Sequence, residues 1–218
     1  GAIADVERQL RLAAALDIGD WMRFEVGPAA RIRAAGAQAA QVRVTAAIGT
    51  KVWAAFQVDI VADGVEMSAE PDPVPPLTSL FMSEKRLWRA YPLVDHVADK
   101  VCAILERHDG RPSTRFKDLV DLVAIAERAT VSAALQIRAL GKEGRRRGLE
   151  LPAGFDVPDR SLWVPGYRAE ARRAAELSAR ELDDALAVAR VFLDPLLAGT
   201  AAGAWDFERQ AWVGPSAG

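Results

Sequence analysis

Along the first part of the chain, the spacing of apolar and polar residues predicts a helix followed by a small sheet. Residues 3–16 show the apolar spacing of an amphipathic helix. Stretches with a period of two follow, each bounded by a turn sequence, at residues 22–26, 30–34, 41–48 and 51–62. Because the connections between these stretches are short, they predict antiparallel pairing of neighbouring strands.

Residues 51–62 form the strongest predicted strand. Ile60 points to its apolar face, and Asp59 points to the opposite face. The segment 70–80 contains four prolines, which disfavour both a helix and a central strand. We therefore expect an ordered connection there, leading to a short strand near residues 87–91.

After Pro92 the apolar spacing becomes helical. It predicts helices at residues 93–108, 115–129, 131–147, 167–178 and 179–197. Ser113 or Thr114 is placed to cap the second of these helices. Residues 148–165, with three prolines and two glycines, predict a loop. We expect the tail, residues 204–213, to add an edge strand or to lie on the surface.

The order of the elements, sheet first and helices second, predicts an α+β fold. We expect a small mixed or antiparallel sheet domain over residues 1–91 and a helical bundle domain over residues 92–218. The sequence contains no internal repeat and no low-complexity segment.

The composition limits the kinds of binding and catalytic site that the chain can contain. The chain has 218 residues, a formal net charge of −2 and a single cysteine, Cys102, which excludes a disulfide framework and a cysteine-rich metal site. Its two histidines are too few for most zinc chemistry. No apolar run approaches the roughly 20 residues that span a bilayer, and no signal peptide precedes the first helix. We therefore expect a cytoplasmic protein without membrane contact.

The chain begins without a methionine and enters a helical pattern at once. This start predicts a chain that lacks the N-terminal part of its parent protein. The alternative is a complete domain behind a trimmed tag, and composition does not distinguish the two.

Two isolated polar residues carry candidate chemistry. Asp59 lies alone on the polar face of its strand, where a carboxylate can hold Mg²⁺ for nucleotidyl transfer or can be a solvated residue in a salt bridge. Lys100 is a compact cation suited to a triphosphate, or one member of an ordinary solvated helix face.

A third candidate is the pair Asp118 and Asp121, which share one face of the helix at 115–129. Lys117 can pair with Asp121 one turn later. Such a pair early in a helix complements the helix dipole. Alternatively, Asp118 is an anchor or general base that faces Lys100 across two helices, and spacing alone does not choose between these roles.

Taken in order, these features resemble a known family. The segment ADKVCAILER at 98–107 and the segment RFKDLVDL at 115–122 follow the strand that carries Asp59. This order and spacing are similar to those of the AbiEii family, the nucleotidyltransferase-like toxins of type IV toxin–antitoxin systems, which include the mycobacterial MenT toxins. The resemblance is recognisable over residues 52–125, and the sheet would then be the remnant of a nucleotidyltransferase palm.

The resemblance implies a role for each matching residue. Lys100 would contact nucleotide phosphates, and Asp118 would be the catalytic aspartate of the fourth motif. Asp59 would occupy the strand carboxylate position of the second motif and hold the metal. Three further positions match in nucleotide-binding or supporting roles: Arg115, Asp99 and Asp121.

The first motif of the family, a Gly-Ser pair followed by Asp/Glu-x-Asp, has no counterpart in this sequence. The resemblance implies that the parent protein transfers a nucleoside monophosphate from an NTP to an RNA acceptor, the tRNA 3′ end, with Mg²⁺. We expect the chain without that motif to be inactive. A cognate antitoxin is also implied, acting without a stable complex or by modification.

Basic residues gather near the end of the third predicted helix, where Arg145, Arg146 and Arg147 are consecutive. Such a cluster can follow the phosphate backbone of RNA, or can complement a helix C-terminus. Later arginines are expected to extend this surface: Arg168, Arg172, Arg173 and Arg180. Burial against the helices is the expected role of the later tryptophans, Trp163, Trp205 and Trp212.

Two other functions stay open at this point. One is a non-catalytic module that binds nucleic acid or protein, with an acidic helix that is merely well capped. The other keeps nucleotide binding but acts on a target other than tRNA.

Overall fold

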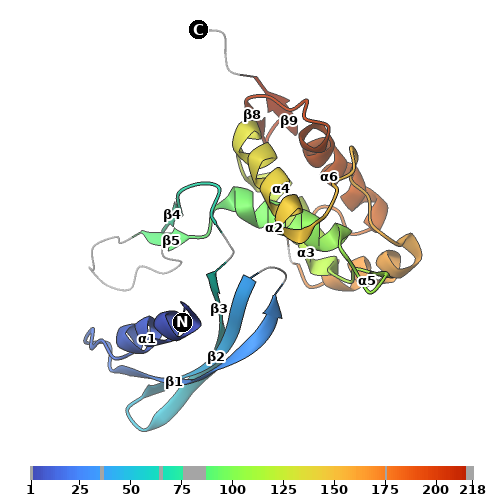
Figure 1. Ribbon diagram of the computed structural model, residues 1–218. Helices are drawn as coiled ribbons and strands as arrows, with labels where there is room; N and C mark the ends of the chain where they lie inside the picture. Colours follow the sequence, from blue (N-terminus) through green and yellow to red (C-terminus); the bar gives the residue numbers. More distant parts are fainter. Residues whose placement is uncertain (1, 35–36, 64–65, 76–86, 175, 215–218) are drawn as a thin grey trace. The chain divides into compact units, whose positions relative to one another are not determined.

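The structure, a computed structural model, describes residues 2–34, 37–63, 66–75, 87–174 and 176–214. The chain forms two compact units, Gly1–Glu66 and Met67–Gly218, which are described here one at a time (Figure 1). The first holds a helix and a three-stranded antiparallel sheet, and the second holds most of the helices. The predicted α+β class is confirmed.

In the first unit, helix α1 (Ala2–Ala14) is followed by strands β1 (Met22–Ala34), β2 (Ala37–Ile48) and β3 (Lys51–Asp63). The sheet order is β1-β2-β3, with antiparallel neighbours. Buried Val42, Val44 and Ile60 pack against Val6 and Leu10 of α1. One face of the sheet is therefore covered by the helix, in line with the alternation in β3.

The predicted strands 22–26 and 30–34 are a single strand, β1, with a register shift between Val26 and Ala29. Gly27 and Pro28 lie in this shift. β1 is an edge strand, where a bulge tolerates a proline that donates no ladder hydrogen bond. The prediction of two separate strands with a turn at Gly27-Pro28 was wrong.

The second unit contains five helices among its described residues: α2 (Leu93–Leu105), α3 (Phe116–Arg128), α4 (Ala133–Arg147), α5 (Arg160–Ala171) and α6 (Leu182–Leu197). A short hairpin of β4 (Asp72–Val74) and β5 (Trp88–Ala90) precedes them. The strand expected near residues 87–91 is therefore present. The predicted connection at 70–80 contains β4, and its residues 76–80 lie outside the described ones.

Helix α2 ends at Leu105, three residues before the predicted end. Arg107–His108 (β6) pairs instead with Arg111–Pro112 (β7). The turn between them is Asp109-Gly110, and both residues have positive φ, 52° and 76°. Asp-Gly is a strong signal for a two-residue hairpin turn, and here it overrides the helical spacing.

Helix α5 begins at Arg160, inside the segment predicted as a loop, and ends before the predicted 178. The Asp159 carboxylate caps it by accepting a hydrogen bond from the Leu162 amide at 3.2 Å. Trp163 and Tyr167, one turn apart, are both buried and donate to the carbonyls of Ser113 and Ala179. Their burial outweighs the presence of Pro165 within the helix.

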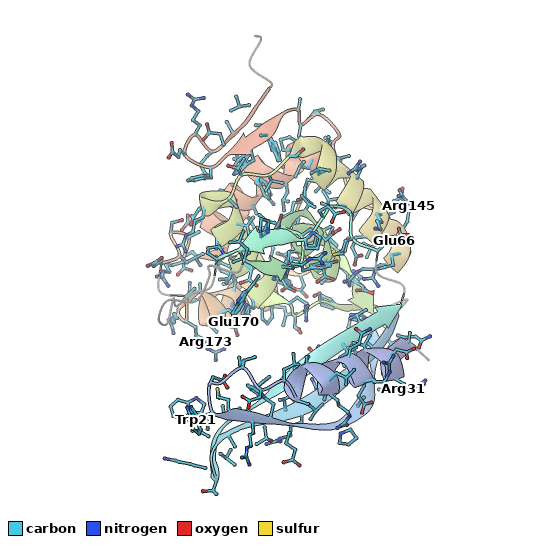
Figure 2. The ribbon with its side chains drawn as sticks, turned by 90° about the vertical axis from the view of Figure 1, so that its left-hand side faces the viewer. Trp21, Arg31, Glu66, Arg145, Glu170 and Arg173 are labelled. Atoms are coloured by element: carbon cyan, nitrogen blue, oxygen red, sulfur yellow. The ribbon has the colours of Figure 1, made fainter. Side chains whose placement is uncertain are left out.

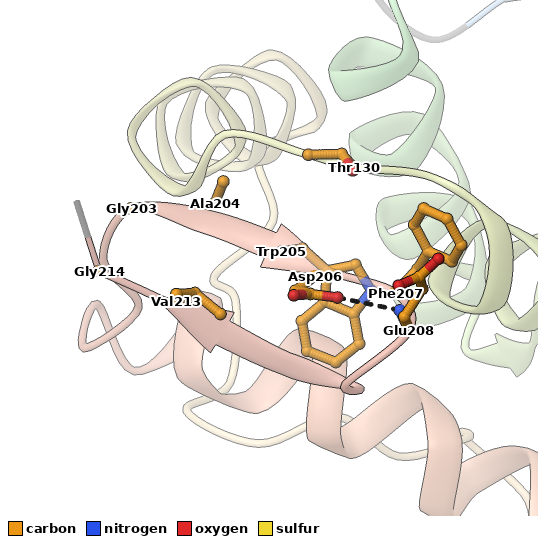
Figure 3. Close-up of a pocket in the computed structure, with 9 residues that line it drawn as sticks. All are labelled: Thr130, Gly203, Ala204, Trp205, Asp206, Phe207, Glu208, Val213 and Gly214. Atoms are coloured by element: carbon orange, nitrogen blue, oxygen red, sulfur yellow. Dashed lines mark hydrogen bonds between the residues drawn. The ribbon is translucent and has the colours of Figure 1, made fainter. Parts of the chain in front are cut away.

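The tail forms a hairpin of β8 (Ala204–Asp206) and β9 (Ala211–Val213). Trp205 is fully buried, donates from Nε1 to the Ala126 carbonyl at 2.8 Å and packs on Phe192. The hairpin is thus part of the core, as is Trp163, and the expected burial of both tryptophans is confirmed. A pocket of about 490 Å³ lies beside this hairpin. Figure 3 shows the residues that line it, Thr130 and Phe207 among them.

No helix within the described residues is long and apolar enough to cross a membrane.

Candidate functional site

Helices α2 and α3 bring three of the predicted site residues together. The Nζ atom of Lys100, on α2, lies 3.3 Å from Oδ1 of Asp118 and 2.7 Å from Oδ2 of Asp121, both on α3. The Lys100 side chain is 16% exposed. The predicted facing of Lys100 and Asp118 across the helix pair is present, and Asp121 lies closer to the ammonium group than Asp118 does.

Two more cations complete this group at the start of α3. Arg115 Nε donates to Asp118 Oδ2 at 2.7 Å, and Lys117 Nζ donates to both oxygens of Asp121 at 3.2 and 3.0 Å. The Arg115 and Lys117 side chains are 59% and 72% exposed. We call these five residues the α2–α3 ion cluster: Lys100, Arg115, Lys117, Asp118 and Asp121.

The apolar stripe of α3 sets this geometry. Leu119, Leu122 and Val123 are fully buried in the core of the second unit. Burying them turns Asp118 and Asp121, which are three residues apart, toward α2. Lys117 was not predicted as a site residue, although its spacing of four from Asp121 was the signal available in the sequence.

Ser113 plays a different part from the predicted cap. The N-cap of α3 is Arg115, and no side chain caps it. Ser113 Oγ donates to the Ala103 carbonyl of α2 at 2.7 Å and accepts from the Arg115 amide at 3.3 Å. Buried Ser113 therefore joins the end of α2 to the start of α3 and fixes the position of Arg115.

Electrostatics keep Lys100 and Asp121 ionised. Burial acts to lower the pKa of Lys100, but the hydrogen bond that Lys100 donates to Asp121 and the charge of Asp118 outweigh it and raise the pKa above its usual value. Burial acts to raise the pKa of Asp121, and the hydrogen bonds from Lys100 and Lys117 outweigh it and lower that pKa. The central lysine is thus a firmly held cation at neutral pH.

Asp99 lies on a different flank of α2 and contacts Arg147 of α4. The Arg147 guanidinium also binds Glu106 and Glu143, each at 2.6 Å, and its side chain is only 10% exposed. Arg146 binds Glu143 as well, with its Nε at 2.8 Å. These pairs tie α2 to α4, so Arg146 and Arg147 have partners within the chain, while Arg145 is exposed.

The basic residues expected to form one surface lie in two places. Figure 2 shows Arg145 and Arg173 on opposite sides of the helical unit. The expectation of a single patch is therefore wrong, because α4 and α5 end at different sides of this unit. Arg168, Arg172 and Arg180 line a separate open depression of about 590 Å³ with Glu181, which pairs with Arg168.

Asp59 belongs to the other unit, on β3. It is exposed, stands opposite Gln41 of β2, and accepts a hydrogen bond from the Gln41 side-chain amide at 2.9 Å. Asp59 thus lies on the polar face of the sheet, as the alternation predicted. Its predicted role as a metal ligand stays a prediction.

The family model for the nucleotidyl transferase AbiEii toxin of type IV toxin–antitoxin systems matches residues 6–211, which is most of the chain. The chain belongs to the AbiEii family. No curated protein matches it in a search with the whole sequence. Membership makes this protein a nucleotidyltransferase toxin, which implies a nucleotide substrate, a cognate antitoxin and a divalent metal.

The described residues of this AbiEii protein do not fit that metal. Nowhere among them do three or more His, Cys, Asp or Glu side chains come together as a metal site. Asp118 and Asp121 are close to each other, but lysine and arginine groups already occupy their oxygens. Asp59 offers one carboxylate, and a metal held there would need further ligands.

Proposed function

We propose that this AbiEii protein is an enzyme that transfers a nucleoside monophosphate from an NTP to RNA, at the 3′ end of tRNA. Its family supplies the reaction class, nucleotidyl transfer. The α2–α3 ion cluster is the observation that carries the proposal. It presents a net positive group, with two exposed cations beside a partly buried one, where phosphates can bind.

In this reaction the 3′-hydroxyl oxygen of the RNA forms a bond to the α-phosphorus of the NTP. The bond from that phosphorus to the bridging oxygen breaks, pyrophosphate leaves with the electron pair, and the proton of the 3′-hydroxyl passes to water. Negative charge grows on the leaving group, and fixed cations placed beside it lower the barrier. Lys100 and Arg115 supply these cations in the proposal, and Mg²⁺ is the cofactor that the family implies.

Asp118 is better suited to positioning than to proton transfer. Its two oxygens accept hydrogen bonds from Lys100 and Arg115, at 3.3 and 2.7 Å, and the residue is only 7% exposed. A carboxylate held in this way fixes the positions of both cations before a polyphosphate binds. We propose that Asp121 supports the same arrangement from the next turn of α3.

Three other predicted residues, Asp99, Arg145 and Asp59, have separate roles in this proposal. Asp99 supports the site indirectly, because its contact with Arg147 holds α2 against α4. Exposed Arg145 is the member of its basic run best placed to contact RNA phosphates. Asp59 remains the proposed metal ligand.

A labelling experiment tests the proposal. The protein is incubated with α-labelled NTPs, total tRNA and Mg²⁺. The variants Lys100→Ala and Asp118→Ala should lose labelling. Arg209→Ala, which removes an exposed arginine of the β8–β9 turn, is the matched control. Labelling of a different class of RNA would show that tRNA is not the acceptor. Full labelling by Lys100→Ala would refute the assignment of Lys100 to the site.

A further inference from the structure

We infer that the α2–α3 ion cluster binds polyphosphate directly as an anion, without a divalent cation of its own. This inference rests on the proposed function and specifies the form in which the substrate's phosphates are recognised. It starts from the disagreement between a family that implies a metal and a site whose residues do not fit one.

Every carboxylate oxygen of the cluster already accepts a hydrogen bond from a cation. Asp118 binds Lys100 through Oδ1 and Arg115 through Oδ2. Asp121 binds Lys117 through both oxygens and Lys100 through Oδ2. A Mg²⁺ ion requires near-octahedral oxygen ligands at about 2.0–2.1 Å, so it would have to displace these ammonium and guanidinium groups.

The balance of charge opposes a metal and favours an anion. Three cations face two carboxylates, which leaves one net positive charge within the cluster. A divalent cation would bring two further positive charges into this group, and a phosphate would neutralise it. The cluster also lies at the N-terminus of the 13-residue helix α3, whose dipole favours negative charge.

The cations keep donors available for a ligand. A guanidinium carries five N–H donors, and the described contacts of Arg115 with side chains use only Nε. The Arg115 and Lys117 side chains are 59% and 72% exposed, whereas Lys100 is held beneath them at 16%. An entering phosphate group would therefore meet the two exposed cations first and the partly buried lysine next.

The first test measures binding of inorganic tripolyphosphate to the whole chain by calorimetry, once in EDTA and once in excess Mg²⁺. We expect binding in EDTA, and weaker binding in Mg²⁺ because chelation neutralises the ligand. Lys100→Ala and Arg115→Ala should each weaken binding in EDTA by roughly ten- to a hundredfold, as expected for loss of a charge-assisted hydrogen bond. Arg209→Ala should leave the affinity unchanged.

The second test uses Mn²⁺ alone as a spectroscopic probe of a metal site. Electron paramagnetic resonance titration should give the same Mn²⁺ affinity for the unmodified chain and for Asp121→Asn. Asp206→Asn, in the β8–β9 hairpin, serves as the matched acid-to-amide control. Loss of Mn²⁺ binding in Asp121→Asn alone would overturn the inference.

The two tests separate the inference from the proposed function. Tripolyphosphate binding that depends on Lys100 but requires Mg²⁺ would overturn the inference and leave the proposed phosphate site in place. Absence of binding in both EDTA and Mg²⁺ would overturn both.

Discussion

The Nζ atom of Lys100 lies 2.7 Å from Oδ2 of Asp121, a residue 21 positions later in the chain. This contact is shorter than the 3.3 Å contact between Lys100 and Asp118, which resemblance to the family had put first. Asp121 is therefore the main anchor of the lysine, and Asp118 shares its charge between Lys100 and Arg115.

This difference predicts unequal effects of two conservative changes on phosphate binding. Asp121→Asn should loosen Lys100 and lower tripolyphosphate affinity several-fold, because the closer charge-assisted hydrogen bond becomes a neutral one. Asp118→Asn should also lower tripolyphosphate affinity, because Lys100 and Arg115 both lose the charge of the carboxylate that holds them. Calorimetry at constant pH measures both, and an affinity unchanged in Asp121→Asn would contradict the assignment of the main anchor.

The lowered pKa of Asp121 predicts a dependence of stability on acid. Because its folded-state pKa lies below the usual 3.8, its stabilising effect is fully present above that value and is lost as pH falls through the folded-state pKa. Asp121→Asn should therefore lose less stability than the unmodified chain between pH 5 and pH 3. Urea unfolding across this range measures the difference, and parallel curves would argue against the ionic contact.

Removal of Arg147 should destabilise the helical unit. Arg147→Ala leaves Glu106 and Glu143, whose side chains are 16% and 14% exposed, without their shared cation. Loss of one partner of such a buried network costs about 3 kcal/mol. Arg145→Ala, on the exposed side of the same helical turn, should change stability by less than about 0.5 kcal/mol. Chemical denaturation of the two variants compares them directly.

A pair of glycine substitutions should have opposite outcomes. A Cβ atom at Gly166 of α5 would lie 2.5–2.6 Å from the ring of Phe116, the first residue of α3. Gly166→Ala should therefore destabilise the unit by about 1–3 kcal/mol through overpacking, and shift the start of α3. Tripolyphosphate affinity should fall with it, because Arg115 and Lys117 flank Phe116.

The matched change is Gly141→Ala in α4. A Cβ there would meet only the flexible end of Arg145, at 3.3 Å. Alanine favours a helix over glycine by about 1 kcal/mol, so this variant should be neutral or more stable. Equal thermal stability of the two variants would argue against the contact between Gly166 and Phe116.

The facing of Lys100 and Asp118 could be predicted because both helices are strongly amphipathic. Their buried stripes fix which residues lie between them, as Leu119 and Leu122 do on α3. The contact between Asp99 and Arg147 spans 48 positions and carries no periodic signal, so only the packing of α2 on α4 reveals it. A run of three arginines gave no indication that two of them would be paired within the chain.

Local rules account for the errors in the helix boundaries. The Asp109-Gly110 turn was readable in the sequence, but the predicted helix extended to His108, past Leu105, the last apolar residue of its stripe. Pro165 led us to predict a loop, whereas the buried pair Trp163 and Tyr167, one turn apart, determines the helix. In both places a pair of residues determines the structure, and the average hydrophobicity of the surrounding segment does not.

The β8–β9 hairpin also has a consequence for synthesis of the protein. The Trp205 amide donates to the Val131 carbonyl, and the Gly203 carbonyl accepts from the Ala133 amide, so the tail closes onto the start of α4. Trp205 also fills the core beside Phe192. The helical unit of a nascent chain would therefore complete its core only after residues 203–213 have left the ribosome.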